Sequence, residues 1–219
     1  MKHIIFIIGS LRRNSFNRQL AKIAEDLIND RFEISYLYFE DIPYMNQDLE
    51  SHIGDINKSP ETKVHYTENG ELEVGHHRLS ESHIETLRQT CIDRVRQEIK
   101  NCDGIWIFTP EYTHSYPGLL KNLLDWLSRP EDISNFSAPT VVHGKKVTVS
   151  GAGGKNKTMS CRDKLNELLE YIKMDVMKDP QVGIELGMEA WVKGEFNLTD
   201  NQMRQLQEQA DKFTDFINN

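Results

Sequence analysis

Residues 104–128 read GIWIFTPEYTHSYPGLLKNLLDWLS, and this stretch decides the fold class. Its first five residues form an uninterrupted apolar run, which is typical of a parallel strand buried on both faces. The chain then turns through a segment bounded by Pro110 and Pro117, after which leucines recur at helical spacing. A strand, a turn and a helix in this order predict one unit of an open α/β sheet. Ligands of such sheets lie just outside the carboxyl ends of the strands, so the turn stands where a ligand would lie.

The rest of the chain repeats this alternation of strands and helices. Residues 4–8 form a second buried apolar run, and the apolar stripe from Leu20 to Ile28 predicts the helix that follows it. The whole pattern predicts one doubly wound, five-stranded parallel sheet with helices on both faces. The expected strands are 4–8, 32–39, 104–108, 146–150 and a weaker one between 174 and 186, and the expected helices carry stripes over 20–28, 84–99, 120–127, 165–172 and 199–218. In the last helix, the side chains expected to face inward are Met203, Leu206, Ala210, Phe213 and Ile217.

A polar insertion follows the second strand. Residues 51–79 carry few apolar side chains, so we expect an insertion within a single domain spanning 1–219 and not a domain with its own core. Inside it, an Asn69-Gly70 pair lies between two short runs, 64–66 and 72–74. An Asn-Gly pair in this position favours a small hairpin.

The composition is that of a globular protein and limits the classes of function. The 34 acidic and 26 basic residues give a net charge of −8, which argues against nucleic acid as a partner, because a phosphate backbone needs a basic face. No stretch approaches the ~18 apolar residues that cross a membrane. The three cysteines form no CxxC pair, and the spacing of the eight histidines predicts no metal site. We therefore expect a cytoplasmic protein without a membrane partner.

The loop after the first strand has the residues of a phosphate site. It reads GSLRRNS over residues 9–15 and leads into a helix N-terminus, where backbone N–H groups and the helix dipole favour an anion. Ser10, Ser15 and Asn17 add short donors, and one of the two arginines adds a charged fork. The loop is neither a Walker A sequence nor GxGxxG, which argues against a nucleoside triphosphatase and a Rossmann dehydrogenase. Taken alone, it fits an ordinary turn with a serine N-cap equally well.

Two further loops follow the third and fourth predicted strands. In the second loop, residues 109–116, a proline-bounded turn can present backbone N–H groups to a flat ring, and Tyr112 or Tyr116 can offer a ring face. The third loop, residues 151–154, reads GAGG, and glycines let the backbone approach a ligand closely. Each loop alone is also explained by packing or by an ordinary connection. Three such loops at one edge of one sheet indicate a flavin nucleotide site.

Two blocks of the sequence resemble a known family. Residues 9–18, GSLRRNSFNR, and residues 110–126, PEYTHSYPGLLKNLLDW, are similar to the NADPH-dependent FMN reductase family of flavodoxin-like proteins. The resemblance covers most of the chain outside residues 51–79, and it implies a flavodoxin-like fold with non-covalently bound FMN. The cofactor-binding residues that it implies are Ser10, Arg12, Ser15, Phe16 and Asn17 in the first loop, Pro110, Glu111, Tyr112 and Thr113 in the second, and Gly151, Gly153 and Gly154 in the third.

The same resemblance implies an activity. It implies an FMN-dependent NAD(P)H oxidoreductase that passes hydride through flavin N5 to a small acceptor, namely a quinone, an azo compound, free flavin or a metal ion. NADPH or NADH would be the reductant, and the subunits would form a homodimer or tetramer. No catalytic side chain is expected, because the flavin carries the chemistry. Where the family commonly has Asn after Pro-Glu-Tyr, this chain has Thr113, which leaves a nicotinamide or substrate contact at that position open.

Two other functions are compatible with the same fold. An electron-carrier flavodoxin would dock on partner enzymes and react slowly with NADPH. A flavin-binding regulatory module would use residues 51–79 to contact a protein partner, and deleting this insertion would then abolish the partner contact and leave turnover intact. The arginine-containing first loop and the Pro-Glu-Tyr block favour the reductase.

Overall fold

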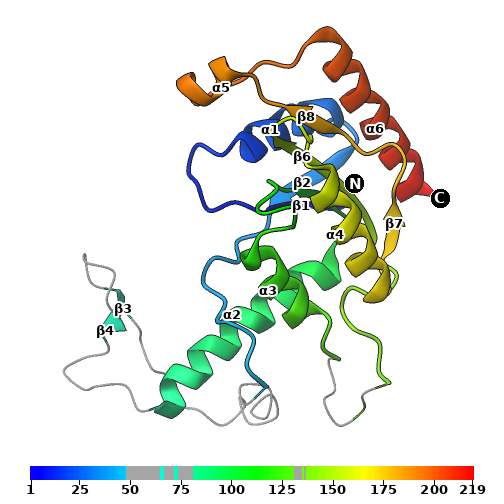
Figure 1. Cartoon of the computed structure of the whole chain (residues 1–219). Helices are drawn as coiled ribbons and strands as arrows, with labels where there is room; N and C mark the ends of the chain where they lie inside the picture. The colour runs from blue at the N-terminus through cyan, green and yellow to red at the C-terminus, as the bar shows by residue number, and fades with distance from the viewer. Residues whose placement is uncertain (48–64, 67–71, 74–80, 131–134, 136) are drawn as a thin grey trace.

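The structure, a computed structural model of the 219-residue chain, describes residues 1–47, 65–66, 72–73, 81–130, 135 and 137–219. The strands of its main sheet are β1 (Lys2–Ile8), β2 (Phe32–Tyr36), β5 (Gly104–Phe108), β6 (Lys146–Gly153), β7 (Asp175–Met177) and β8 (Gly183–Glu185). The helices are α1 (Phe16–Ile28), α2 (Glu81–Asn101), α3 (Gly118–Leu127), α4 (Met159–Tyr171), α5 (Met188–Lys193) and α6 (Asp200–Asn218). The strand order is β2-β1-β5-β6-β7 with β8 also pairing with β6, and these pairs are parallel, so the predicted flavodoxin-like sheet is confirmed (Figure 1).

The fifth position of the sheet is filled by two short strands placed end to end. β7 pairs with residues 146–148 of β6, and β8 pairs with residues 151–153. The predicted fifth strand is therefore confirmed in its place, as two pieces. The prediction that the fourth strand ends at Ser150 and that a loop follows was wrong, because β8 and the residues next to it offer backbone hydrogen-bond partners that keep residues 151–153 in the sheet.

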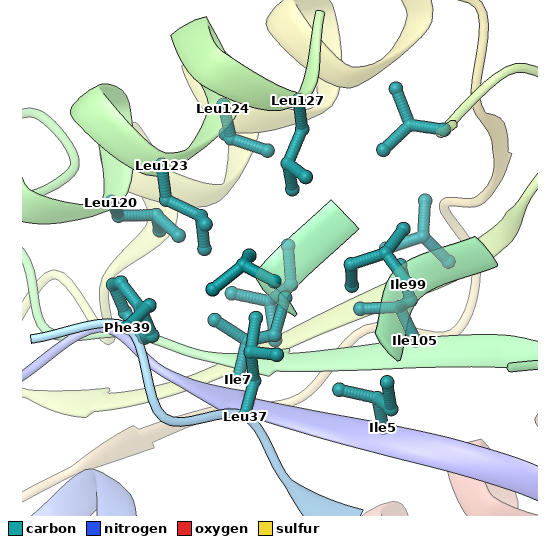
Figure 2. Packing of buried hydrophobic residues seen from close by; sticks show 14 of the residues in the cluster. Ile5, Ile7, Leu37, Phe39, Ile99, Ile105, Leu120, Leu123, Leu124 and Leu127 are labelled. Atoms are coloured by element: carbon teal, nitrogen blue, oxygen red, sulfur yellow. The ribbon is translucent and has the colours of Figure 1, made fainter. Parts of the chain in front are cut away.

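Helices cover both faces of the sheet and divide its apolar core into two clusters. Ile5 and Ile7 of β1 point to the cluster that they share with α2, α3 and α4, whereas Ile4 and Phe6 point to the cluster shared with α1 and α6. Figure 2 shows the first cluster, where leucines of α3 meet Ile99 and the two isoleucines of β1. This alternation follows from the two-residue period of a strand buried on both faces.

The sequence pattern located the long helices correctly. α1, α3, α4 and α6 all occupy their predicted stripes, and Trp126 of α3 is buried with its indole Nε1 donating to the Pro43 carbonyl at 2.8 Å. Met203 was predicted to face inward but is 38% exposed, because it lies in the first turn of α6, ahead of the part that covers the sheet. The second strand ends at Tyr36, three residues earlier than predicted. α5 was not predicted.

Part of the insertion is also described. β3 (His65–Tyr66) and β4 (Leu72–Glu73) pair antiparallel, with His65 opposite Glu73. The predicted Asn69-Gly70 turn lies outside the described residues. Within the described part of the chain, no helix has the length and apolar character needed to span a lipid bilayer.

Candidate functional site

The strand order reverses between β1 and β5, and the first two predicted loops meet at the carboxyl ends of these strands. A cavity of about 300 Å³ opens there. From the first loop it is lined by Gly9, Ser10, Leu11 and Arg12, and from the second loop and the start of α3 by Tyr112, Pro117, Gly118 and Leu119. The structure therefore brings together predicted site residues that lie about a hundred positions apart in the chain.

The two serines of the first loop both stabilise the loop and keep a proton to donate. Ser15 is the N-cap of α1: its hydroxyl accepts from the Asn17 N–H at 3.2 Å, and its carbonyl accepts from the N–H groups of Arg18 and Gln19. The Ser10 hydroxyl accepts from the Arg12 N–H at 3.4 Å. A hydroxyl that accepts one bond still has its own O–H to donate. The N-cap reading of the first loop is thus confirmed, and it is compatible with an anion in front of the loop.

Arg12 supplies the positive charge of the loop. Its guanidinium carbon lies 5.2 Å from the centre of the Phe16 ring, a cation–π distance. Phe16 itself is buried. Among the described residues no carboxylate pairs with Arg12, so its fork of donors is available to a phosphate.

Both polar atoms of the Asn17 side chain are hydrogen-bonded to the backbone of β6. Its Nδ2 donates to the Ala152 carbonyl at 3.2 Å, and its Oδ1 accepts from the Ala152 N–H at 2.8 Å. The side chain is 2% exposed. Asn17 therefore ties α1 to the end of β6 and holds the first and third predicted loops at a fixed separation.

The side chain of Thr158 packs against two of the three glycines of the third predicted loop and leaves no room for a side chain there. A Cβ added to Gly151 would collide with Thr158 Oγ1, and one added to Gly153 would lie 2.9 Å from Thr158 Cγ2. These glycines make room for a threonine, not for open solvent. Gly154 differs, since a Cβ there would meet no heavy atom within 4 Å. It is the position of the three where a ligand could approach the backbone.

The second loop contains a strained two-residue turn. Tyr112 and Ser115 exchange two backbone hydrogen bonds of 2.9 and 3.0 Å, and the residues between them, Thr113 and His114, have φ of +51° and +57°. Positive φ at both central positions is the mark of a type I′ turn, which favours Asn and Gly. Thr113, the residue at which this chain departs from the family pattern, is thus held in a conformation that β-branched residues avoid.

We expect Thr113→Asn to stabilise the protein. Asn tolerates the left-handed region at lower cost, so the free energy of unfolding should rise by about 1 kcal/mol. Urea denaturation at neutral pH measures the change. Thr113→Val keeps the branched shape and serves as the control, with no gain expected. A stability unchanged by Thr113→Asn would show that the turn stores no such strain.

Glu111 anchors the second loop to the N-terminus of α4. Its carboxylate accepts from Asn156 Nδ2 at 2.8 and 3.0 Å and from the Cys161 N–H at 3.0 Å, and His114 Nδ1 lies 3.4 Å away. Partial burial raises the pKa of the Glu111 carboxyl, but the Asn156 and Cys161 hydrogen bonds and the His114 charge outweigh it and hold the pKa below its ordinary value. The carboxylate of Glu111 fixes the loop that carries Tyr112, and a contact between Glu111 and the cofactor stays a prediction.

Replacing Glu111 by glutamine should lower the free energy of unfolding by about 2 kcal/mol at neutral pH, since hydrogen bonds to a charged acceptor are lost. Because the pKa of Glu111 is lowered in the folded state, its carboxylate stabilises the fold above the ordinary value of 4.5, and this contribution is lost as pH falls through the folded pKa. Urea denaturation at a series of pH values from neutral to below 4.5 should show the free energies of unfolding of the two proteins becoming equal in acid. Glu98→Gln, which removes an exposed pair with Arg94, is the control. A difference that stays constant in acid would contradict this account.

Sequence reasoning missed three contributors to the site. Asn156 and Thr158 lie between β6 and α4 and act through Glu111 and the glycines. The segment after β8 lies beside the first loop, where the Gly194 carbonyl accepts from Asn14 Nδ2 at 3.0 Å. An N-terminal loop and a C-terminal segment meet here, and no local pattern reports such a contact. Among the described residues, no group of His, Cys, Asp or Glu side chains forms a candidate metal site.

Comparison with known proteins gives matches over most of the chain. The family model described as NADPH-dependent FMN reductase matches residues 2–189. A 2-hydroxy-1,4-benzoquinone reductase of a Burkholderia species is 26% identical over 98% of this chain and 95% of its own length. A quinone reductase of Escherichia coli K12 is 26% identical over 81% of this chain and 74% of its own. The solved structure of FerB, a flavoenzyme NAD(P)H:(acceptor) oxidoreductase from Paracoccus denitrificans, superimposes with a TM-score of 0.72 at 25% identity, covering 100% of this chain and 98% of FerB.

Proposed function

Since this chain belongs to the NADPH-dependent FMN reductase family and is an FMN-dependent NAD(P)H oxidoreductase, we propose that its acceptor is a quinone and that its FMN lies in the crevice between β1 and β5. The observation that carries the proposal is the cavity at the point where the strand order reverses, with Ser10 and Arg12 on one wall and Tyr112 on the other. The relatives named as quinone reductases support the choice of acceptor.

The residues present fit the phosphate of FMN. Ser15 caps the N-terminus of α1, where the helix dipole favours an anion, and the Ser10 hydroxyl and the Arg12 guanidinium belong to the same loop and can donate to it. Phe16 supports Arg12, and Asn17 fixes the loop against β6. A phosphate there would receive charge-assisted hydrogen bonds without displacing any described ion pair of the loop.

The other two loops fit the flavin ring. We propose that the backbone from Pro110 to Thr113 and the open backbone at Gly154 line it, while Gly151 and Gly153 keep the end of β6 flat against Thr158. When bound, FMN carries hydride from the nicotinamide to the acceptor. The protein holds Tyr112 in place through Glu111 and leaves the residue 55% exposed, so an apolar planar acceptor can rest against its ring.

An anaerobic titration tests this function. Purified protein loaded with FMN should lose its flavin absorption band on addition of NADPH or NADH, and a benzoquinone should restore the band with one equivalent. Among a benzoquinone, an azo dye, free FMN and a ferric chelate, the quinone should give the largest kcat/KM. If the nicotinamides leave the band unchanged, the oxidoreductase assignment fails, and if the quinone is not preferred, only the acceptor is wrong.

The same titration separates the electron-carrier alternative. A flavodoxin-type carrier would accept electrons slowly from NADPH and pass them to a partner protein, so the band would persist for minutes. The family match and the relatives favour the reductase. A regulatory role of the 51–79 insertion is tested by deleting it and measuring turnover with the quinone.

We further propose that the chain acts as a single domain in the cytoplasm and assembles as a homodimer or tetramer. Its net charge of −8 supports solubility. Sedimentation velocity of the FMN-loaded protein measures the assembly, and a monomer at micromolar concentration would contradict it.

A further inference from the structure

Residues 187–197, here called the α5 segment, hold the first loop from outside. α5 is capped at its C-terminus by Gly194, whose φ is +75° and whose carbonyl accepts from Asn14 Nδ2 at 3.0 Å and from Gln19 Nε2 at 2.8 Å. Gln19 Nε2 also donates to Asn14 Oδ1 at 3.1 Å, and Gln19 Oε1 accepts from the Phe196 N–H at 3.4 Å. Both ends of the Gln19 amide are therefore used to tie the first loop and α1 to the α5 segment.

Aromatic contacts form a second connection. Phe16 meets Trp191 edge to face, with ring centres 5.2 Å apart and planes at 81°, and meets Phe196 at 6.0 Å and 73°. Phe16 also contacts the Arg12 guanidinium, whose carbon lies 5.2 Å from the ring centre. The α5 segment thus supports the ring on which the positive charge of the first loop rests.

These contacts come from a part of the chain that the family match does not include. The match ends at residue 189, whereas Trp191, Gly194 and Phe196 lie beyond it. The family model therefore does not include them. The contacts on the other side, Asn14, Phe16 and Gln19, all lie within the match.

We propose that the α5 segment is a positioning element that sets the affinity of this protein for the phosphate of FMN. The inference rests on the proposed function, because it takes the phosphate to lie at the first loop. A loop already held in its binding conformation loses less conformational freedom when the ligand arrives, so it binds more tightly. Gln19 and Trp191 act through Asn14, Phe16 and Arg12.

Riboflavin is the probe that isolates the effect, because it has the ring of FMN and lacks the phosphate. Fluorescence titration of the apo-protein gives a dissociation constant for each flavin. Gln19→Ala should raise the Kd for FMN about tenfold and leave the Kd for riboflavin unchanged. Trp191→Ala should act in the same direction. Trp191→Phe keeps a ring edge against Phe16 and should restore FMN affinity to near the wild-type value.

The matched control is Gln97→Ala, which removes an exposed amide that donates to Asn101 on the same helix, α2. It should change neither affinity. The proposal is overturned if Gln19→Ala and Trp191→Ala bind FMN as tightly as the wild type. It is also overturned if FMN and riboflavin affinities fall by the same factor, which would indicate a general loosening of the site.

Failure of the proposed function looks different. A wild-type protein that binds neither flavin removes the premise, whereas both outcomes above leave flavin binding by the wild type intact. Circular dichroism melting shows that each variant is folded. Because the two substitutions act on separate contacts, one hydrogen-bonded and one aromatic, either alone decides the question if the other variant does not fold.

Discussion

Gln209→Leu is expected to lower the free energy of unfolding by about 4 kcal/mol. Gln209 is fully buried on α6, and all of its amide is used. Its Oε1 accepts from the Ser150 hydroxyl and the Val182 N–H, each at 2.8 Å. Its Nε2 donates to Thr148 Oγ1 at 2.9 Å and to the Val149 carbonyl at 3.1 Å. Leucine has a similar volume, so the loss comes from polar groups left buried without partners.

This network explains why the effect should be large. Val182 lies between β7 and β8, where the edge of the sheet is interrupted, and its N–H is satisfied by the Gln209 side chain. Ser150 in turn accepts from the Trp106 indole at 3.0 Å, so the loss spreads to the neighbouring strand.

Equilibrium urea denaturation of wild type and variant measures the difference. Gln207→Ala is the control, because Gln207 lies on the same helix with its amide bonded to exposed Asp211, and its effect should stay within about 0.5 kcal/mol. Should Gln209→Leu cost less than about 1 kcal/mol, the buried network contributes little to stability.

Gly151→Ala should be the second most damaging substitution, with a loss of about 3 kcal/mol. The added Cβ would collide with Thr158 Oγ1 and lie 2.5 Å from the Thr109 carbonyl oxygen. The Thr158 hydroxyl can move, but the Thr109 carbonyl is backbone. Thr109 directly follows β5, and its N–H donates to the Ser150 carbonyl, which fixes it against β6. Either the end of β5 or the end of β6 must shift. Both ends lead into the loops that we propose to line the flavin ring, so FMN affinity should fall together with stability.

Gly154→Ala separates ligand contact from packing. No heavy atom lies within 4 Å of the added Cβ, so stability should change by less than about 0.5 kcal/mol. If the flavin ring lies over this backbone, the Kd for FMN should nevertheless rise several-fold. Thermal melting and fluorescence titration of the Gly151→Ala and Gly154→Ala variants give both quantities. A Gly154→Ala variant with unchanged FMN affinity would place the ring elsewhere.

The fold could be predicted from the sequence because the hydrophobic pattern within each main element indicates whether it is a strand or a helix. β1 and β5 are continuous apolar runs, which indicates strands buried on both faces. In α3 the leucines recur at helical spacing, which indicates a helix with one buried face. α5 could not be found in this way, since a six-residue helix is too short to show a period. The break between β7 and β8 could not be predicted either, because it depends on a hydrogen bond from the Val182 N–H to Gln209, a residue of α6 that lies far along the chain.

The site was predictable in position and less so in detail. The loops after β1 and β5 were located by the rule for open sheets, and a cavity lies between them. The roles of individual side chains depend on partners far along the chain. Asn17 bonds Ala152, and Glu111 bonds Asn156. The partners lie far apart in the chain, so no local sequence pattern predicts either contact. Glycine composition likewise cannot distinguish a strand packed on Thr158 from an open loop.

The division of the outermost strand into β7 and β8 also bears on how the folded protein behaves at high concentration. An exposed strand edge is a template on which another chain can pair, and long regular edges invite aggregation. Here each piece is three residues long, and the peptide groups near the break bond inward, Val182 N–H to Gln209 and the Gln181 carbonyl to Arg162 Nη1. An incoming strand would therefore find no continuous row of free backbone groups along residues 175–185. The interruption that Gln209 bridges therefore also hinders strand addition at this edge of the sheet.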